Sequence, residues 1–151
     1  MYHRGRNSGR KKDQSETVYT DRDVAQYWDQ NADVWTEQVR QANDAFREHF
    51  NNPAFLKFTG DLKGKEVLDA GCGMGRFSIA SAEFGARDVL AIDLSDAVES
   101  AYRNSRHLPN VHVIQADIYH LPFKRPADFA YSIGVLHHLP DPQGGFNAMV
   151  S

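Results

Sequence analysis

The sequence is poor in cysteine, has no long apolar run and carries no large excess of either charge. One cysteine among 151 residues excludes an internal disulfide and fits a reducing compartment. Without a long apolar run we expect no transmembrane helix, and the polar N-terminus lacks the apolar core of a secretory signal. A net charge of −3 gives no sign of a nucleic-acid partner. These absences predict a cytoplasmic protein without a membrane span.

The composition divides the chain into three segments. Residues 1–17 combine five cations with few apolar residues, so we expect a disordered basic tail; a basic arm for RNA or lipid is the alternative. Residues 18–60 begin with a capping box from Thr20 to Asp23 and continue with apolar residues at spacings of three and four, which predicts helices. Residues 61–151 form the main domain.

From residue 66 onward, short apolar strands alternate with helical patterns. We expect strands at 66–70, 88–93, 111–115 and 128–133, and helices at 75–84, 96–106 and from Pro142 onward. Strands that alternate with helices in this way predict an α/β fold, with a parallel sheet covered by helices on both faces.

A glycine-rich turn follows the first strand and is the most informative feature of the chain. Gly71, Gly73 and Gly75 let backbone N–H groups approach a ligand closely, and the helix N-terminus that follows supplies more donors. A dinucleotide fingerprint reads G-x-G-x-x-G, whereas here the third glycine comes one residue early. Asp69, two residues before the first glycine, suits a ligand with an ammonium group. An NAD(P)-dependent oxidoreductase is therefore disfavoured.

Two more acids stand at the ends of the next strands. Asp93 ends the second strand, where a carboxylate accepts hydrogen bonds from ribose hydroxyls; a helix cap without a ligand is the alternative. Asp117 follows the third strand, where it is placed to accept from an adenine amino group while the Ile118 N–H donates to the ring; a turn-capping Asp is the alternative. Three acids at successive strand ends favour a nucleoside ligand.

The chain resembles the Rossmann-like (class I) methyltransferases that use S-adenosylmethionine (SAM). The turn after the first strand is similar to their motif I. The segment Phe129-Ala-Tyr-Ser-Ile-Gly-Val-Leu-His-His-Leu-Pro-Asp141 is similar to the motif after strand four in the small-molecule type 11 branch, which includes ubiquinone- and menaquinone-biosynthesis-like enzymes. The resemblance implies SAM as cofactor, a small-molecule methyl acceptor, strand order 3-2-1-4 and an N-terminal helical lid over residues 18–60.

The family's domain has further strands after the fourth, so the resemblance also implies a C-terminally truncated Rossmann-like domain. Its fourth strand would then be an open edge that favours self-association. A truncated domain leaves two functional hypotheses: a SAM-dependent methyltransferase, or a SAM-binding fragment without catalytic activity. The identity of the acceptor does not follow from this sequence.

The resemblance implies a set of cofactor-binding residues, which all lie near the carboxyl ends of the strands. The methionine part is held by Asp69, Gly71, Cys72 and Gly73, with Cys72 as a small packing residue and not a nucleophile. The ribose and adenine are held by Asp93 and Leu94, the adenine edge is framed by Asp117 and Ile118, and the sulfonium is lined by Ser132 and Ile133.

The remaining candidate residues are two histidines and three aromatic residues. His137 and His138 are neighbours on a helical turn and cannot both face one metal, so we expect no metal site. His137 is a candidate general base. Tyr27, Trp28 and Trp35 either close over the cofactor or pack as a helix face against the sheet.

Overall fold

A computed structural model describes residues 20, 22–23, 26–30, 34, 52–123 and 127–151. The elements in chain order are α2 (Asn52–Thr59), β1 (Glu66–Ala70), α3 (Arg76–Glu83), β2 (Asp88–Asp93), α4 (Ala97–Ser105), β3 (Val111–Gln115), β4 (Phe129–Tyr131), the 3-10 helix η2 (Leu136–His138) and α5 (Pro142–Val150). The predicted tail at 1–17, Trp35 and most of the predicted lid lie outside the described residues.

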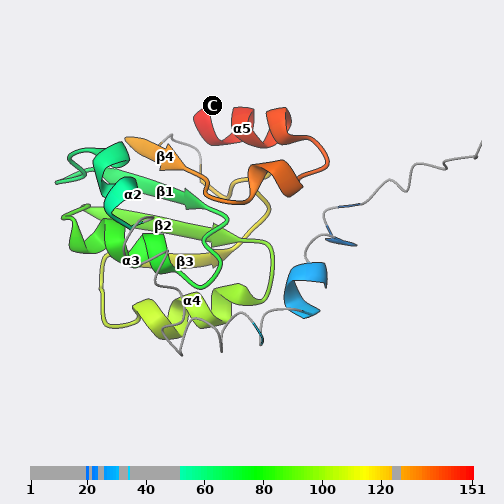
Figure 1. Ribbon diagram of the computed structural model, residues 1–151, viewed down its shortest axis with the longest axis horizontal. Coiled ribbons are helices and arrows are strands. Elements are labelled where there is room, and N and C mark those ends of the chain that lie inside the picture. The colour runs from blue at the N-terminus through cyan, green and yellow to red at the C-terminus, as the bar shows by residue number, and fades with distance from the viewer. Residues whose placement is uncertain (1–19, 21, 24–25, 31–33, 35–51, 124–126) are drawn as a thin grey trace, which may run out of the picture.

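The four strands form a parallel sheet in the order β3-β2-β1-β4, as predicted (Figure 1). β1 lies in the middle, and every one of its five residues is buried. A strand buried on both faces is usually apolar; Val67, Leu68 and Ala70 follow this rule, whereas Glu66 and Asp69 are buried acids. Two adjacent central strands, β1 and β2, thus place the glycine turn and Asp93 side by side at one edge of the sheet.

The fourth strand is shorter than predicted, because β4 covers three residues and not 128–133. It pairs only with the middle of β1. The end of β1 leads directly into the glycine turn, where the Gly71 N–H donates to the carbonyl of Ile92 in β2 instead. Asp128 lies before the strand, and its carboxylate accepts the backbone N–H of Glu66 at 2.8 Å. Within the described sheet β4 is an edge strand; self-association through it stays a prediction.

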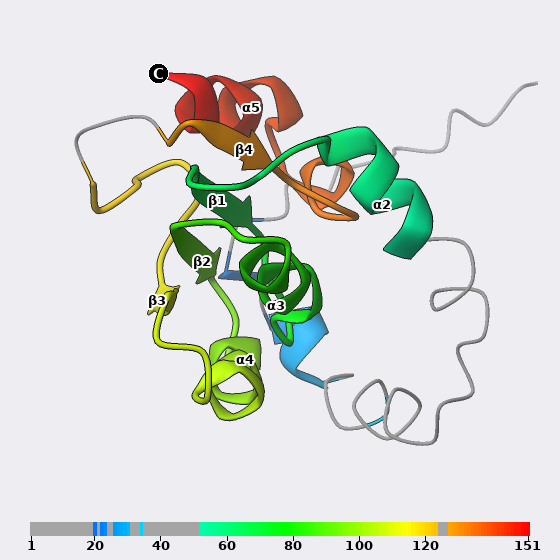
Figure 2. The same ribbon diagram turned by 90° about the vertical axis from the view of Figure 1, so that its left-hand side faces the viewer.

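The two faces of the sheet have separate apolar cores, and Figure 2 shows α2 and α3 together on one side of the sheet. On one face, Val67 and Val89 pack with Phe55 of α2 and Ala82 of α3. On the other face, a cluster around Leu68, Ile92 and Met149 includes residues of α5, of η2 and of the segment after β3. Side chains alternate between faces along each strand, so odd-numbered residues of β1 point towards α2 and α3. This parity places Asp69 beneath α3.

Two helix N-termini are capped by side chains that directly precede or begin the helix. Thr20 and Asp23 form the predicted reciprocal capping box, with the Thr20 N–H donating to Asp23 at 2.8 Å and the Asp23 N–H donating to Thr20 at 3.3 Å. Asp141 caps α5 by accepting the Gly144 N–H at 2.9 Å. The helices in the described part of the chain are all too short or too polar to cross a membrane.

Candidate functional site

The glycine turn needs its glycines for different reasons. Gly71, Gly73 and Gly75 all have positive φ, at 87°, 52° and 83°. A Cβ on Gly71 would overlap the side chain of Val135, and one on Gly75 would lie 3.2 Å from the backbone of Ala101. A Cβ on Gly73 would meet no atom of the described residues within 4 Å. The turn therefore packs closely against Val135 at Gly71 and against Ala101 at Gly75, whereas the space beside Gly73 is open.

The Asp93 carboxylate connects the end of β2 to this turn through a hydrogen bond. Its Oδ2 accepts the Gly73 N–H at 2.8 Å, and its Oδ1 accepts the Ser95 N–H at 3.0 Å and the Ser95 hydroxyl at 2.7 Å. The alternative role as a helix cap is not what the structure shows, since the N-cap of α4 is Asp96. Asp93 is only partly buried, so its carboxylate lies at the edge where a ligand's hydroxyls would approach.

Asp69 lies beneath the turn and is 2% exposed. Its Oδ2 accepts the Ser78 hydroxyl of α3 at 2.6 Å. Burial raises its pKa from 3.8 to about 7, against the opposing effect of hydrogen bonds from Ser78 and Tyr131. The predicted contact between Asp69 and a ligand's ammonium group stays a prediction, and in the structure its carboxylate accepts a hydrogen bond from the Ser78 hydroxyl.

Cys72 is buried in the turn and 8% exposed. Burial raises the pKa of its thiol well above the usual range, and the nearby carboxylates of Asp69 and Asp93 raise it further. A thiol that stays protonated at neutral pH is a poor nucleophile. The environment of Cys72 therefore agrees with the predicted packing role.

The residues predicted to hold adenine lie between the ends of β2 and β3. Leu94 is 37% exposed, and its carbonyl accepts the Gln115 side-chain amide at 3.1 Å. Asp117 accepts the Tyr119 N–H at 2.9 Å, which is the turn-capping bond that the sequence left as an alternative. The Ile118 side chain is 7% exposed and packs in the core. Asp117 thus has a local structural role, and a second role in ligand binding stays a prediction.

The segment after β4 brings a buried polar atom to the same edge. The Ser132 hydroxyl is buried and has no hydrogen-bond partner within the part of the chain that the structure describes, and a buried polar group without a partner is rare in folded proteins. Ile133, next in the chain, is 42% exposed. The hydroxyl of Ser132 and the space at Gly73 are features that a bound molecule would satisfy and fill.

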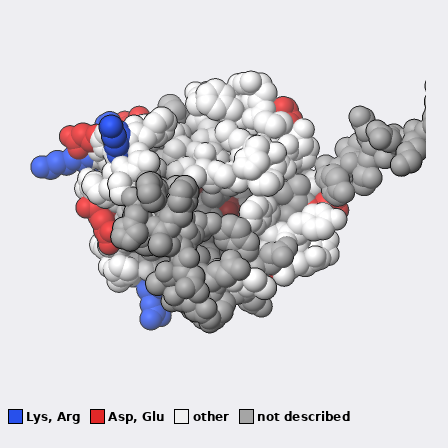
Figure 3. All heavy atoms as spheres, viewed as in Figure 1, with Lys and Arg blue, Asp and Glu red and all other residues white. Residues whose placement is uncertain are grey.

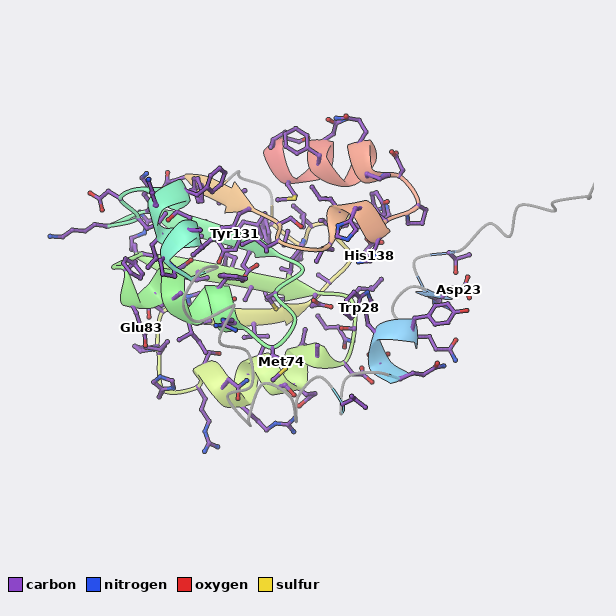
Figure 4. The ribbon with its side chains drawn as sticks, in the orientation of Figure 1. Asp23, Trp28, Met74, Glu83, Tyr131 and His138 are labelled. Atoms are coloured by element: carbon purple, nitrogen blue, oxygen red, sulfur yellow. The ribbon has the colours of Figure 1, made fainter. Side chains whose placement is uncertain are left out.

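The two histidines of η2 contact each other and a tryptophan. The rings of His137 and His138 lie 3.9 Å apart, and the Trp28 ring meets His138 edge-on at 5.4 Å (Figure 4). Among the described residues, no group of three His, Cys, Asp or Glu side chains is arranged to hold a metal ion. His137 is exposed, and its role as a general base stays a prediction.

The described N-terminal residues 26–30 are helical and lie at the carboxyl ends of the strands (Figure 1). Besides the Trp28 contact with His138, the Asp29 carboxylate accepts the Asp96 N–H at 3.0 Å. One helical turn thus touches the segment after β2 and the segment after β4. Trp28 was predicted either to close over the cofactor or to pack against the sheet, and both roles stay predictions. Asp29 was not predicted to take part.

Charged side chains concentrate at the opposite edge, where the strands begin. Arg87 contacts Glu66 at 2.9 Å and Asp88 at 3.1 Å, and His112 contacts Asp88 at 3.2 Å. The Lys and Arg side chains visible in Figure 3 also lie towards this end. These contacts join the starts of β1, β2 and β3, far from the glycine turn, so they have a structural role.

Comparisons with known proteins agree with this geometry. A family model described as "Methyltransferase domain" matches residues 67–150. A ubiquinone biosynthesis O-methyltransferase of Acinetobacter baylyi is 30% identical over 129 residues, which are 79% of this chain and 49% of that protein. A tRNA U34 carboxymethyltransferase of Pseudoalteromonas translucida is 36% identical over 84 residues, 54% of this chain and 26% of that protein.

A solved structure shows the same fold with ligands bound. Phosphoethanolamine N-methyltransferase 1 of Haemonchus contortus, in complex with phosphoethanolamine and S-adenosylhomocysteine, superposes with a TM-score of 0.64 at 25% identity, covering 77% of this chain and 26% of that one. The chain spans between about a quarter and a half of the length of the curated relatives described above, at 26% and 49%.

Proposed function

Since the chain belongs to the methyltransferase-domain family of Rossmann-like, SAM-dependent methyltransferases, we propose that it transfers a methyl group from SAM to a small-molecule acceptor. The observation that carries the proposal is the pair formed by Asp93 and Gly73, because it holds an acidic strand end against a glycine turn with free space. A nucleoside with a charged amino-acid arm fits this combination of a carboxylate, backbone N–H donors and room for a ligand.

The residues at this edge fit the cofactor. The Asp93 carboxylate has about four acceptor sites. Both sites on Oδ1 and one on Oδ2 are taken by Ser95 and Gly73, so one site on Oδ2 would accept a ribose hydroxyl. Gly71 and Gly73 would hold the methionine part, Ser132 with its unpartnered hydroxyl would lie near the sulfonium, and Leu94 would contact the adenine. When bound, SAM supplies an electrophilic methyl group.

The chain's own residues would mainly orient the acceptor and exclude water. The helical residues 26–30, which touch the segments after β2 and β4, are placed to cover the edge of the sheet. His137 is the candidate for taking a proton from the acceptor, as an exposed imidazole on the segment after β4. Methyl transfer needs no further catalytic group when the acceptor is already a good nucleophile.

Two observations support a small-molecule acceptor. The ubiquinone biosynthesis relative aligns with 79% of this chain and the tRNA-modifying relative with 54%. The chain is also mildly acidic, with a net charge of −3, whereas proteins that bind nucleic acid usually present a basic surface.

The proposal is tested with SAM that carries a labelled methyl group. The chain is incubated with three acceptor pools, namely a low-molecular-weight extract, bulk tRNA and ribosomal protein. We expect label in the low-molecular-weight pool, and Asp93→Ala should reduce it. Label in tRNA or protein instead would contradict the acceptor class. Binding of SAM without transfer to any pool would favour a cofactor-binding unit without activity.

A further inference from the structure

A tyrosine in the loop after β3 is hydrogen-bonded to the backbone just before α5. The Tyr119 hydroxyl donates to the carbonyl of Asp141 at 3.0 Å and accepts the Asp141 N–H at 3.1 Å, although the two residues stand 22 positions apart. A hydroxyl can donate and accept at the same time, so one side chain bonds both backbone groups of Asp141. The double contact joins the segment after β3 to the segment after β4.

The first turns of α5 leave room for the tyrosine ring. Gly144 and Gly145 lie inside α5, although glycine is unfavourable in a helix. A Cβ on Gly144 would lie 3.4 Å from the Tyr119 ring, and one on Gly145 would lie 3.8 Å from the ring and overlap the side chain of Leu139. The two glycines therefore let the ring approach α5 closely, and the ring is held by this packing as well as by its hydroxyl.

The loop that carries Tyr119 belongs to the predicted cofactor site. The Tyr119 N–H donates to the carboxylate of Asp117 at 2.9 Å, and Asp117 and Ile118 are the residues predicted to frame the adenine. The Ala116 N–H donates to the carbonyl of Asp93 at 2.9 Å, which connects the same loop to the end of β2. The loop is thus fixed to the edge of the sheet at which SAM is proposed to bind.

The segment between β4 and α5 is anchored at both of its ends. At its start, the Val135 side chain fills the place that a Cβ on Gly71 would occupy. At its end, the backbone of Asp141 is bonded to the tyrosine hydroxyl. Between these anchors lies η2, in which the His138 N–H donates to the Val135 carbonyl at 2.8 Å. Because η2 also carries His137, the two anchors determine where that exposed imidazole lies.

We propose that Tyr119 is a positioning residue, whose hydroxyl fixes η2 relative to the cofactor edge, so that SAM binding orders the segment that carries His137. The inference rests on the proposed function and adds a residue outside the predicted cofactor-binding set. A ligand that contacts the loop after β3 restricts the motion of that loop, and the two hydrogen bonds of the hydroxyl extend the restriction to Asp141. Without the hydroxyl, SAM would still order the loop, but η2 would keep only its anchor at Val135.

The test is amide hydrogen exchange of the 151-residue chain, measured by NMR with and without saturating SAM. The reporters are the amides of His138 and Leu139, which donate to the carbonyls of Val135 and Leu136 and therefore report on η2 itself. In the wild type, SAM should slow the exchange of both amides by roughly two- to tenfold, the factor that corresponds to the net contribution of one hydrogen bond.

The variants separate positioning from a general loss of stability. Tyr119→Phe keeps the ring and removes the hydroxyl, so SAM should slow the reporter amides by less than about twofold while it still slows the Ala116 amide. Tyr119→Leu also lacks the hydroxyl and should behave in the same way. Asp141→Ala removes the side-chain cap of α5 and keeps the backbone groups that Tyr119 bonds. It should melt at a lower temperature but show the wild-type response.

Two further controls complete the experiment. Tyr102→Phe removes a hydroxyl from a residue that is 61% exposed on α4 and should match the wild type. Tyr119 is only partly buried and Asp141 is exposed, so water can replace the lost hydrogen bonds and Tyr119→Phe should fold. Circular dichroism checks the fold of every variant.

Each result decides the inference. Equal slowing of the reporter amides in the wild type and in either folded Tyr119 variant would overturn it, as would wild-type protein that binds SAM without any slowing; both results leave the proposed function intact. Loss of the response in Asp141→Ala would show that the hydroxyl acts only through the stability of α5, which also overturns the inference. Absence of SAM binding by the wild-type chain in calorimetry would overturn the proposed function as well.

Discussion

The carboxylate of Asp93 accepts the backbone N–H of Gly73 at 2.8 Å, although the two residues stand 20 positions apart. The contact exists because β1 and β2 are parallel neighbours, so the loops at their carboxyl ends meet at the same edge. The contact brings the glycine-rich turn and Asp93 together in one site.

Loss of the Asp93 carboxylate should weaken cofactor binding. Asp93→Ala removes charge-assisted hydrogen bonds, so we expect a loss of about 1.5–3 kcal/mol in SAM affinity. Asp93→Asn keeps the shape of the side chain and should show a smaller loss. Calorimetric titration with SAM measures both, and unchanged affinity in two folded variants would show that Asp93 serves only the turn.

Gly71 and Gly73 should respond differently to the same substitution. Both have positive φ, so alanine costs about 1–2 kcal/mol at either position. Gly71→Ala adds an overlap with Val135, whereas Gly73→Ala meets open space. We therefore expect Gly71→Ala to lower the melting temperature more than Gly73→Ala does. Equal melting temperatures for the two variants would contradict the close packing at Gly71.

Asp69 should make the folded state less stable as the pH rises. Its pKa is raised from 3.8 to about 7, so between these values the folded chain binds a proton that the unfolded chain does not. Its contribution to stability is therefore present at low pH and is lost as the pH rises towards 7. Relative to wild type, Asp69→Asn should gain roughly 2–3 kcal/mol between pH 5 and pH 8.

Urea denaturation of both proteins at the two pH values measures this difference. The exposed Asp61 provides a matched control, since Asp61→Asn should change stability equally at both pH values. A difference between wild type and Asp69→Asn that does not vary with pH would show that Asp69 is already ionised at pH 5.

The contact between Trp28 and His138 should slow the release of the cofactor. The two rings meet edge-on at 5.4 Å, and such a pair contributes about 0.5–1.5 kcal/mol. Trp28→Ala should therefore increase the dissociation rate of SAM by roughly two- to tenfold, measured by stopped-flow competition. Tyr102→Ala, on the exposed face of α4, should leave the rate unchanged. Equal rates for all three proteins would mean that residues 26–30 do not cover the cofactor.

The sequence predicted the bounds of a strand correctly where an apolar run ends at turn-forming residues. β1, β2 and β3 have the predicted bounds, because each run is short and bounded by polar or turn-forming residues. β4 was predicted too long, since its length depends on how far β1 pairs with it and not on its own residues. The turn at residue 71 ends that pairing, and only the assembled sheet shows this.

The sequence predicted which acids lie at the site, but it did not predict their hydrogen-bond partners. The rule for parallel strands placed the acids near the ends of β1 and β2 and after β3 at one edge, but their hydrogen-bond partners depend on side-chain direction. Ser78 was missed as the hydrogen-bond partner of Asp69. The signal was available in the parity of β1, which puts Asp69 on the same face as Val67 and therefore under α3.

The central claim is that the edge at Asp93 and Gly73 binds SAM, and a calorimetric comparison of SAM with NAD tests it most directly. The account predicts that the wild-type chain binds SAM at one site and that Asp93→Ala weakens this binding, with no detectable binding of NAD under the same conditions. Tighter binding of NAD than of SAM, or SAM binding that Asp93→Ala leaves unchanged, would contradict it.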